Sequence, residues 1–210
     1  VRCGFRDFRF ADGHFQLNGR RIFLKGLIYN THFPFTYEFP HDPELVRRDV
    51  SNLKKAGYNL VRIAFRSMPQ VLELCDEAGL LAYQEHYGSW QLQNSPAMKS
   101  RWNASISEVI LRDRNHPSLV MLGLLNEEVN NHVFKHALTS LPMIRELDPT
   151  RLVQLNSGRF DGRADVGSLS NPGSVAWEGK MSDLSDIHAY PFCPLSSETI
   201  HWLRTLRGKG

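Results

Sequence analysis

Two patterns of hydrophobic residues alternate along the chain. Short, nearly continuous apolar runs alternate with longer stretches in which apolar residues recur every three or four positions. The first pattern is typical of buried strands, and the second is typical of helices that pack by one face. The expected strands are 21–29, 59–65, 80–85, 119–125, 152–157 and 186–190, and the expected helices are 42–57, 69–79, 98–112, 132–147 and 196–206.

One unit of this alternation occurs twice in succession. The segments KKAGYNLVRI and DEAGLLAYQE align with Gly57 on Gly79, and each glycine follows a helical stretch and precedes a strand. Helix, glycine cap and strand in this order predict βα units, with parallel strands that are covered by helices. Before the first unit, Asp12-Gly13 and Asn18-Gly19 are signals for hairpin turns.

The helix boundaries also carry local signals. Asp42 is a suitable N-cap for the first helix, and Pro43 suits its first helical position. Pro142 lies inside the stretch 132–147, where its missing N–H predicts a kink or a restart of the helix. The segment 158–185 is expected to be a long loop.

Parallel strands with intervening helices leave two architectures, an open doubly wound sheet and a (β/α)8 barrel. The segment LKGLIYNTHFP lacks the G-x-G-x-x-G spacing of dinucleotide binders. Polar residues instead end several strands, as a barrel active site requires. They are Tyr29, Asn30, Arg62, Gln84, Glu85, Asn126, Glu127, Asn156, His188 and Tyr190. The pattern predicts a partial TIM barrel of about six βα units after a short β-hairpin segment.

Glu127 is the candidate with the clearest chemistry. An ionised carboxylate is costly beside a core, yet Glu127 directly follows the apolar run SLVMLGLL and Asn126. At a barrel mouth a half-buried carboxylic acid with a raised pKa can protonate a leaving group. The alternative is a helix N-terminus, where a glutamate stabilises the helix dipole. Glu128 has no comparable support and is expected to be solvated or to cap the helix.

Composition narrows the classes of function. The net charge of +3 is too small to indicate nucleic-acid binding, and no apolar run approaches the roughly 18 to 20 residues that cross a bilayer. Cys3, Cys75 and Cys193 are too widely spaced for a disulfide framework, and Cys75 is expected to be a buried, inert thiol. His132 and His136 lack the H-E-x-x-H context, so a solvated helix face is expected rather than a metal site. The sequence predicts no cofactor, no metal and no membrane partner.

Several segments resemble consecutive blocks of the catalytic domain of glycoside hydrolase family 2. They are FQLNGRRIFLKG, RRDVSNLKKAGYNLVRIA, LELCDEAGLLAYQE and VILRDRNHPSLVMLGLLNEE. The family holds β-galactosidases, β-glucuronidases and β-mannosidases on a (β/α)8 barrel. The segment GFRDFRFADG resembles the stretch by which such chains leave a preceding β-sandwich domain. The resemblance implies a linker and hairpin over 1–20 and a partial barrel over 21–210.

The resemblance also implies a retaining double displacement on a β-glycoside, by an exo-acting enzyme. Glu127 would be the general acid/base, and Asn126 would bind the sugar 2-hydroxyl. The family's nucleophile is a glutamate that ends the seventh strand, about 5 to 5.5 Å from the acid/base. The last residues, LRTLRGKG, follow only the sixth expected strand, so the nucleophile and the C-terminal part of the barrel are expected to be missing from this chain.

Other site residues carry over from the family with less specific roles. Arg62 matches an arginine near the nucleophile, and Glu85 matches an acid that supports the site. His188 and Tyr190 point to one side of their strand, and the tyrosine fits a place beside the nucleophile. Trp177 could stack on a sugar face or simply anchor its loop. Many relatives carry a sugar-binding histidine where this chain has Phe65, so the identity of the sugar is left open.

Three hypotheses from different classes therefore remain. The first is an exo-β-glycosidase domain within a longer polypeptide. Its partner would then be the missing C-terminal part of its own barrel. The second is an inactive or carbohydrate-binding barrel remnant. The third is a barrel enzyme of unrelated chemistry, such as an aldolase, for which Lys25 is the one candidate Schiff-base lysine near a strand end.

Overall fold

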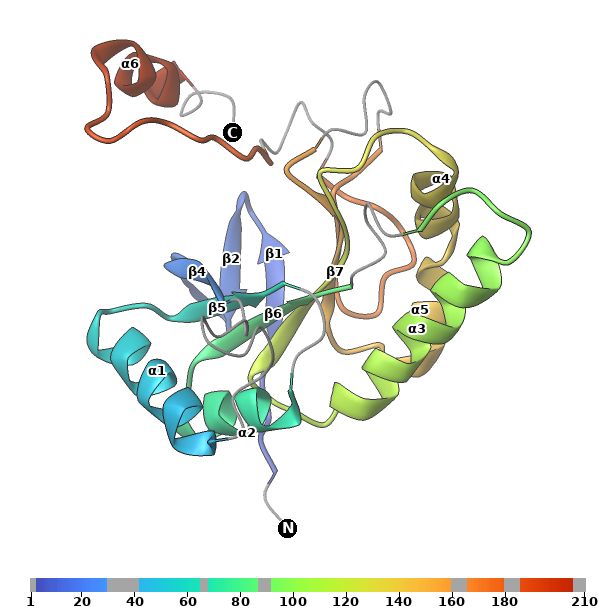
Figure 1. Ribbon diagram of the computed structural model, residues 1–210, viewed down its shortest axis with the longest axis horizontal. Coiled ribbons are helices and arrows are strands. Elements are labelled where there is room, and N and C mark those ends of the chain that lie inside the picture. The colour runs from blue at the N-terminus through green and yellow to red at the C-terminus, as the bar shows by residue number, and fades with distance from the viewer. Residues whose placement is uncertain are drawn as a thin grey trace.

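The main sheet of the protein is a curved set of parallel strands (Figure 1). The computed structural model describes residues 3–29, 42–64, 68–86, 92–159, 166–179 and 186–205. Within these ranges the strand order is β4-β5-β6-β7-β8-β9, and β4 to β8 pair in parallel. The strands are Gly26–Tyr29 (β4), Leu60–Ile63 (β5), Leu81–Glu85 (β6), Leu119–Asn126 (β7), Leu152–Ser157 (β8) and Leu169–Ser170 (β9). The predicted alternation of parallel strands and helices is confirmed.

The helices begin and end close to the predicted positions. They are Pro43–Lys55 (α1), Pro69–Ala78 (α2), Met98–Asp113 (α3), His132–Thr139 (α4), Leu141–Leu147 (α5) and Ser197–Thr205 (α6). The Asp42 carboxylate accepts a hydrogen bond from the backbone N–H of Glu44, as an N-cap does. Gly79 ends α2 in the left-handed conformation. Pro142 lies in the first turn of α5, so the predicted restart separates α4 from α5.

A separate antiparallel sheet precedes the barrel strands. It consists of Phe8–Ala11 (β1), His14–Leu17 (β2) and Arg20–Arg21 (β3). Its two turns have positive φ at both central residues, 53° and 75° at Asp12-Gly13 and 52° and 74° at Asn18-Gly19. These angles match the hairpin turns that the two dipeptides predict. The single strand expected over 21–29 was wrong, because β3 pairs with β2 whereas β4 pairs with β5.

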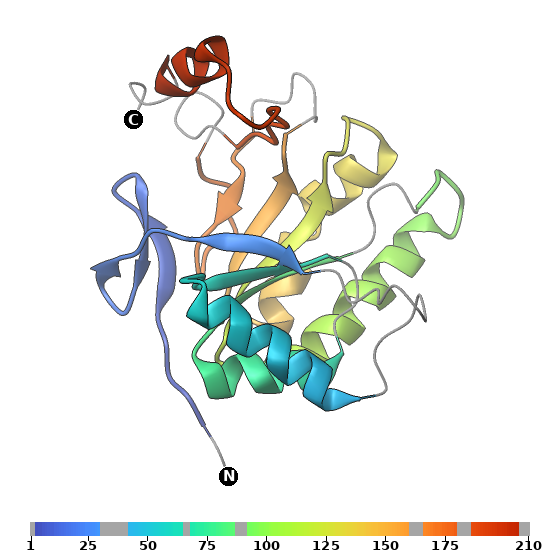
Figure 2. The same ribbon diagram turned by 60° about the vertical axis from the view of Figure 1, so that its left-hand side comes forward.

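Hydrophobic residues pack against both faces of the main sheet. On the outer face, α1 to α5 contribute side chains such as Val50, Leu72 and the fully buried Trp102 to the larger core. On the inner face, Phe8 of β1 packs with Leu60 and other sheet residues in a second core. The small sheet therefore lies on the concave side of the strands (Figures 1 and 2). The remaining part of that concave side, at the carboxyl ends of the strands, holds polar residues.

The segment after β8 departs from the sequence prediction. Residues 186–190 were expected to form the sixth parallel strand, but the structure assigns no strand there. Instead β9, within the expected loop, runs antiparallel to β8. Arg145 of α5 holds this segment, because its guanidinium donates to the carbonyls of Ser170, Asn171 and Ser174. The strand–loop assignment between 158 and 190 was therefore wrong.

The C-terminal helix stands apart from the outer helix layer. α6 buries none of its residues and lies beyond the carboxyl ends of the strands (Figure 2). No helix in the described ranges is long and apolar enough to span a bilayer. Asn30 and Phe65, two of the residues noted in the sequence, lie outside the described residues.

Candidate active site

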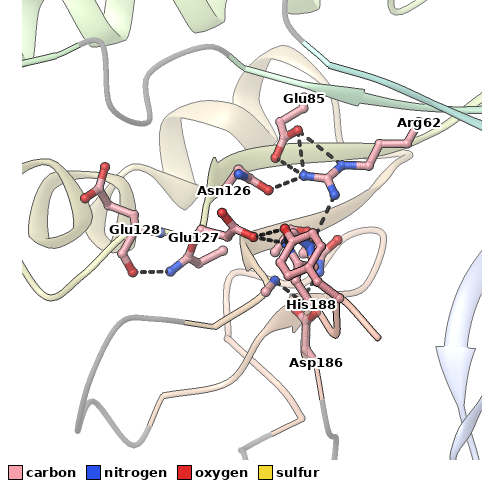
Figure 3. A network of polar contacts seen from close by, with 12 residues as sticks. Arg62, Glu85, Asn126, Glu127, Glu128, Asp186 and His188 are labelled. Atoms are coloured by element: carbon pink, nitrogen blue, oxygen red, sulfur yellow. Dashed lines mark hydrogen bonds and ion pairs between the residues drawn. The ribbon is translucent and has the colours of Figure 1, made fainter. Parts of the chain in front are cut away.

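Most of the predicted strand-end residues converge on one hydrogen-bonded group (Figure 3). Arg62 belongs to β5, Glu85 ends β6, Asn126 ends β7 and Ser157 ends β8. Carboxyl ends of adjacent parallel strands meet at one edge of a sheet, which is why residues far apart in the sequence gather here. Glu127, which follows Asn126 directly, lies among them.

Arg62 and Glu85 form the most buried ion pair of this group. Arg62 Nη2 lies 2.8 Å from both carboxylate oxygens of Glu85, and Nε lies 3.2 Å from Oε2. The side chains are 15% and 6% exposed. Burial raises the pKa of Glu85, although the positive charge of Arg62 opposes that shift. Arg62 Nη2 also donates to Asn126 Oδ1, so one guanidinium links β5, β6 and β7.

The backbone at Glu127 has an unusual conformation. Its φ is 50°, in the left-handed region that non-glycine residues rarely occupy. Its N–H donates to the carbonyl of Ser157 at 2.7 Å, which continues the pairing of β7 with β8 for one more residue. The helix-cap alternative is not what the structure shows, because Asn131 accepts the N–H of Phe134 at the start of α4. The conformation instead turns the Glu127 side chain toward the group of strand-end residues.

Two donors meet on one oxygen of Glu127. His188 Nδ1 lies 2.6 Å from Oε1, and the Tyr190 hydroxyl donates to the same oxygen. The Tyr190 hydrogen bond is the main reason that the pKa of Glu127 is lowered, with His188 contributing in the same direction. The sequence predicted a raised pKa for Glu127, and that prediction was wrong for this structure. The carboxylate is only partly buried, so desolvation is outweighed by hydrogen bonds that stabilise its charged form.

The side chain of Glu128 does not join the group around Glu127, and its environment differs from the one expected from the sequence. It is buried, whereas the sequence suggested a solvated or capping acid. Its Oε1 accepts from Asn131 Nδ2 at 2.7 Å and from the Val129 N–H at 3.2 Å. Its backbone N–H and carbonyl both bond to the amide of Asn156. Glu128 therefore shapes the turn between β7 and α4 and holds the residue that caps α4.

Two residues that sequence reasoning did not select complete the group. Ser157 Oγ lies 2.8 Å from His188 Nε2. Asp186 accepts from Gln154 Nε2 at 2.6 Å and from the N–H of Gly158 at 3.2 Å. These bonds attach the segment that carries His188 to the end of β8. The position of Ser157 at the end of an apolar strand was the one available signal in the sequence.

The remaining candidates lie outside this group. The Trp177 indole donates to the carbonyl of Leu138 at 3.0 Å and packs against the outer core, so it anchors its loop. His136 is not on a solvated face, since Nε2 lies 2.7 Å from Asn103 Oδ1. Lys25 directly precedes β4, at the amino end of the strand, which is the wrong end for a barrel active site.

Cys75 is fully buried, and burial raises the pKa of its thiol to about 12, as an inert cysteine requires. In the described ranges, His, Cys, Asp and Glu side chains form no group of three that could hold a metal ion. The candidate site thus offers a partly exposed carboxylate, that of Glu127, with one oxygen held by two donors. Such a group can exchange a proton through its other oxygen.

Comparisons with known proteins give a consistent result. Residues 8–194 match the family model described as glycosyl hydrolases family 2, TIM barrel domain. Beta-galactosidases of Thermoanaerobacterium thermosulfurigenes and Thermoanaerobacter pseudethanolicus are 33% and 34% identical to this chain over 154 and 155 residues. These alignments cover 71% of this chain and 21% and 20% of the relatives, so the chain spans about a fifth of their length.

Solved structures show the same fold. The GH2 beta-galacturonidase from Eisenbergiella tayi, bound to galacturonate, has a TM-score of 0.67 and 28% identity over 76% of this chain and 30% of that one. The Parabacteroides merdae beta-glucuronidase has a TM-score of 0.71 at 23% identity, over 81% of this chain and 23% of that one. The partial TIM barrel predicted from the sequence is confirmed by these likenesses.

Proposed function

The chain belongs to glycoside hydrolase family 2, and from that membership we propose that it forms the acid/base half of the active site of a retaining exo-β-glycosidase. Glu127 is the general acid/base, and Asn126 binds the sugar hydroxyl next to the anomeric carbon. The substrates are β-glycosides of the galactoside, glucuronide or mannoside type. The placement of Glu127 supports this proposal most directly, because its strained backbone turns a carboxylate into the polar end of the barrel.

The lowered pKa of Glu127 is compatible with this role. In a retaining mechanism the same residue is an acid in the first step and a base in the second. Hydrogen bonds from Tyr190 and His188 stabilise the carboxylate, which is the form that the second step uses. Burial by a bound sugar acts in the opposite direction and raises the pKa of a carboxyl group, which favours the acid needed first.

The nucleophile is proposed to come from a later βα unit of the same polypeptide. Near Glu127, the other carboxylates of the described residues already have partners. Glu85 pairs with Arg62 at two points, and Asp186 accepts from Gln154 and Gly158.

Residues 1–20, which include the first two strands of the small sheet, are proposed to follow a β-sandwich domain.

The test is Glu127→Gln in the full-length polypeptide. Turnover of a natural glycoside should fall by about 10² to 10⁴-fold, because the proton donor is lost. Substrates with activated aryl leaving groups need less protonation, so their first step should suffer less. Azide attacks the glycosyl-enzyme intermediate without a general base, so added azide should restore turnover and yield a β-glycosyl azide. Wild-type turnover of the natural glycoside by Glu127→Gln would contradict the assignment.

The matched control is Glu128→Gln. Glu128 accepts hydrogen bonds from Asn131 and Val129 in the turn before α4, and its loss should reduce stability without an azide effect. An azide-dependent recovery of Glu128→Gln, combined with unchanged activity of Glu127→Gln, would show that the neighbouring residue is the acid/base.

A further inference from the structure

The imidazole ring of His188 contacts polar groups from the ends of three strands, β5, β7 and β8. Its Nδ1 is 2.6 Å from Glu127 Oε1, and its Nε2 is 2.8 Å from Ser157 Oγ. The same Nε2 is 3.2 Å from Arg62 Nη1 (Figure 3). Both ring nitrogens therefore have partners, and the chemistry of those partners determines which nitrogen carries the proton.

The partners of Nε2 require it to be an acceptor. A guanidinium has only N–H donors and no lone pair, so Arg62 cannot accept a hydrogen bond from Nε2. A serine hydroxyl can donate, so Ser157 and Arg62 can share the lone pair of an unprotonated Nε2. The single proton of a neutral imidazole is then on Nδ1, where it points at the carboxylate of Glu127. A proton on Nε2 would instead face the positive charge of Arg62.

The ring is held in place by contacts that do not involve Glu127. Gly158 has a φ of 64°, and a Cβ built on it would lie 2.4 Å from His188 Cγ and Nδ1, so the ring lies directly against this glycine. Asp186, two residues before His188, is bound by Gln154 and by the N–H of Gly158. The orientation of the imidazole is thus fixed by β8 and its following turn.

We propose that His188 is a positioning residue for Glu127, held as the neutral Nδ1–H tautomer by Arg62 and Ser157. Together with Tyr190, His188 occupies Oε1 of Glu127 and leaves Oε2 as the oxygen that exchanges the proton with the glycoside. The proposal rests on the proposed function in one respect, namely that Glu127 is the acid/base. The charged and titratable groups around the ring are Arg62, Glu85, Glu127, Asp186 and Tyr190.

The tautomer can be observed without any measurement of activity. Full-length polypeptide labelled with ¹⁵N-histidine should show, for His188, a pyrrole-type Nδ1 and a pyridine-type Nε2 at neutral pH. The resonances are assigned by their disappearance in His188→Asn. Ser157→Ala should broaden or shift the Nε2 signal, whereas Ser168→Ala, at a buried serine bonded to Arg159, should leave it unchanged. A protonated Nε2 at neutral pH would overturn the proposal.

A pair of amide substitutions tests the role in catalysis. The amide nitrogen of asparagine falls near the position of Nδ1, and that of glutamine falls near Nε2. His188→Asn should therefore keep a donor to Glu127 and retain most of kcat/KM, with the alkaline limb of its pH profile near that of the wild type. His188→Gln loses a hydrogen bond to a charged group, so kcat/KM should fall about ten- to hundredfold. The alkaline limb should also move to higher pH, because the carboxylate of Glu127 is then less stabilised.

The serine gives an independent check. Ser157→Thr keeps the hydroxyl and should preserve the pH profile, whereas Ser157→Ala should shift it in the same direction as His188→Gln by a smaller amount. Equal activities and pH profiles of His188→Asn and His188→Gln, in variants with wild-type unfolding midpoints, would overturn the proposal. That result would leave the acid/base assignment intact if Glu127→Gln is inactive and rescued by azide. An active Glu127→Gln would overturn the proposed function while leaving the tautomer measurement valid.

Discussion

Arg62 and Glu85, on the neighbouring strands β5 and β6, form a two-point ion pair whose side chains are both largely removed from solvent. The same guanidinium also bonds to Asn126 and contacts His188. A planar fork of N–H groups can serve several acceptors at once, which a lysine ammonium at this position could not do with the same geometry. Arg62, held by Glu85, thus fixes the positions of Asn126 and His188 around Glu127.

The first prediction is that Glu85→Gln strongly destabilises the protein. Removal of one partner leaves the Arg62 charge buried and uncompensated, which costs about 3 to 5 kcal/mol of unfolding free energy in comparable pairs. Urea unfolding monitored by tryptophan fluorescence measures this change. The control is Glu77→Gln, which breaks the exposed pair with Arg47 and should leave the midpoint unchanged. Equal midpoints for both variants would show that burial of the Arg62 pair has no energetic consequence.

The second prediction concerns Gly158, against which the His188 ring packs. In Gly158→Ala the new methyl group would clash with the His188 ring, and alanine would have to adopt the left-handed backbone conformation. Both stability and activity should therefore fall. Gly173→Ala is the matched control, because its φ is 77° and a Cβ there meets no atom within 4 Å. That variant should lose only the backbone cost, about 1 to 2 kcal/mol, and keep its activity per folded molecule. Similar kcat/KM losses in both variants would contradict the packing argument.

The third prediction is a shift in the pH dependence of Tyr190→Phe. The hydroxyl of Tyr190 stabilises the carboxylate of Glu127 and is the largest cause of its lowered pKa. Without it the pKa rises, so the protonated acid persists to higher pH. If Glu127 is the acid/base as proposed, the alkaline limb of kcat/KM reports loss of that proton in the free enzyme and should therefore move to higher pH. A limb that moves to lower pH in Tyr190→Phe would show that the hydroxyl does not stabilise the carboxylate in the full-length enzyme.

Much of the fold was predictable because its signals are local. Asp42, Gly79 and the two hairpin dipeptides each specify a cap or a turn by their own conformational preferences, and the structure agrees. The restart of the helix at Pro142 follows from the missing N–H in the same way. Residues 186–190 were misassigned because their alternating pattern fits a strand. Asp186 and His188 instead attach this segment to the end of β8 through side-chain hydrogen bonds, which no local pattern reports.

Most residues of the candidate site were predictable from the sequence, but Ser157, Asp186 and the electrostatics of the site were not. Strand ends identified Arg62, Glu85, Asn126 and Glu127, because parallel strands bring their carboxyl ends together. The direction of the pKa shift of Glu127 depends on donors from His188 and Tyr190, 61 and 63 residues away in the sequence. Buried Glu128 is likewise held by bonds to Asn131 in its own turn and to Asn156, which is 28 residues away in the sequence. Neither property follows from the residue types alone.

The last prediction concerns Arg145, which holds the segment after β8 against α5. Its guanidinium donates to the carbonyls of Ser170, Asn171 and Ser174, and Nη1 donates to the carbonyl of Arg151. Arg145→Lys keeps the charge but offers one nitrogen in place of three, so most of these buried carbonyls lose their donor, at a cost of about 1 to 3 kcal/mol for each unsatisfied group.

The amides of Leu169, which begins β9, and of Ser168 directly before it should report this loss before the whole domain unfolds. The N–H groups of Ser168 and Leu169 donate to the carbonyls of Gly179 and Glu178, so their hydrogen exchange should accelerate in Arg145→Lys. Amides of β7, which lie between β6 and β8, should keep their protection. Arg9→Lys, at an exposed pair with Asp7, is the control and should change neither set. Unchanged exchange at 168–169 in Arg145→Lys would mean that β8 and residues 178–179 hold β9 in place and that the guanidinium contributes nothing to local stability.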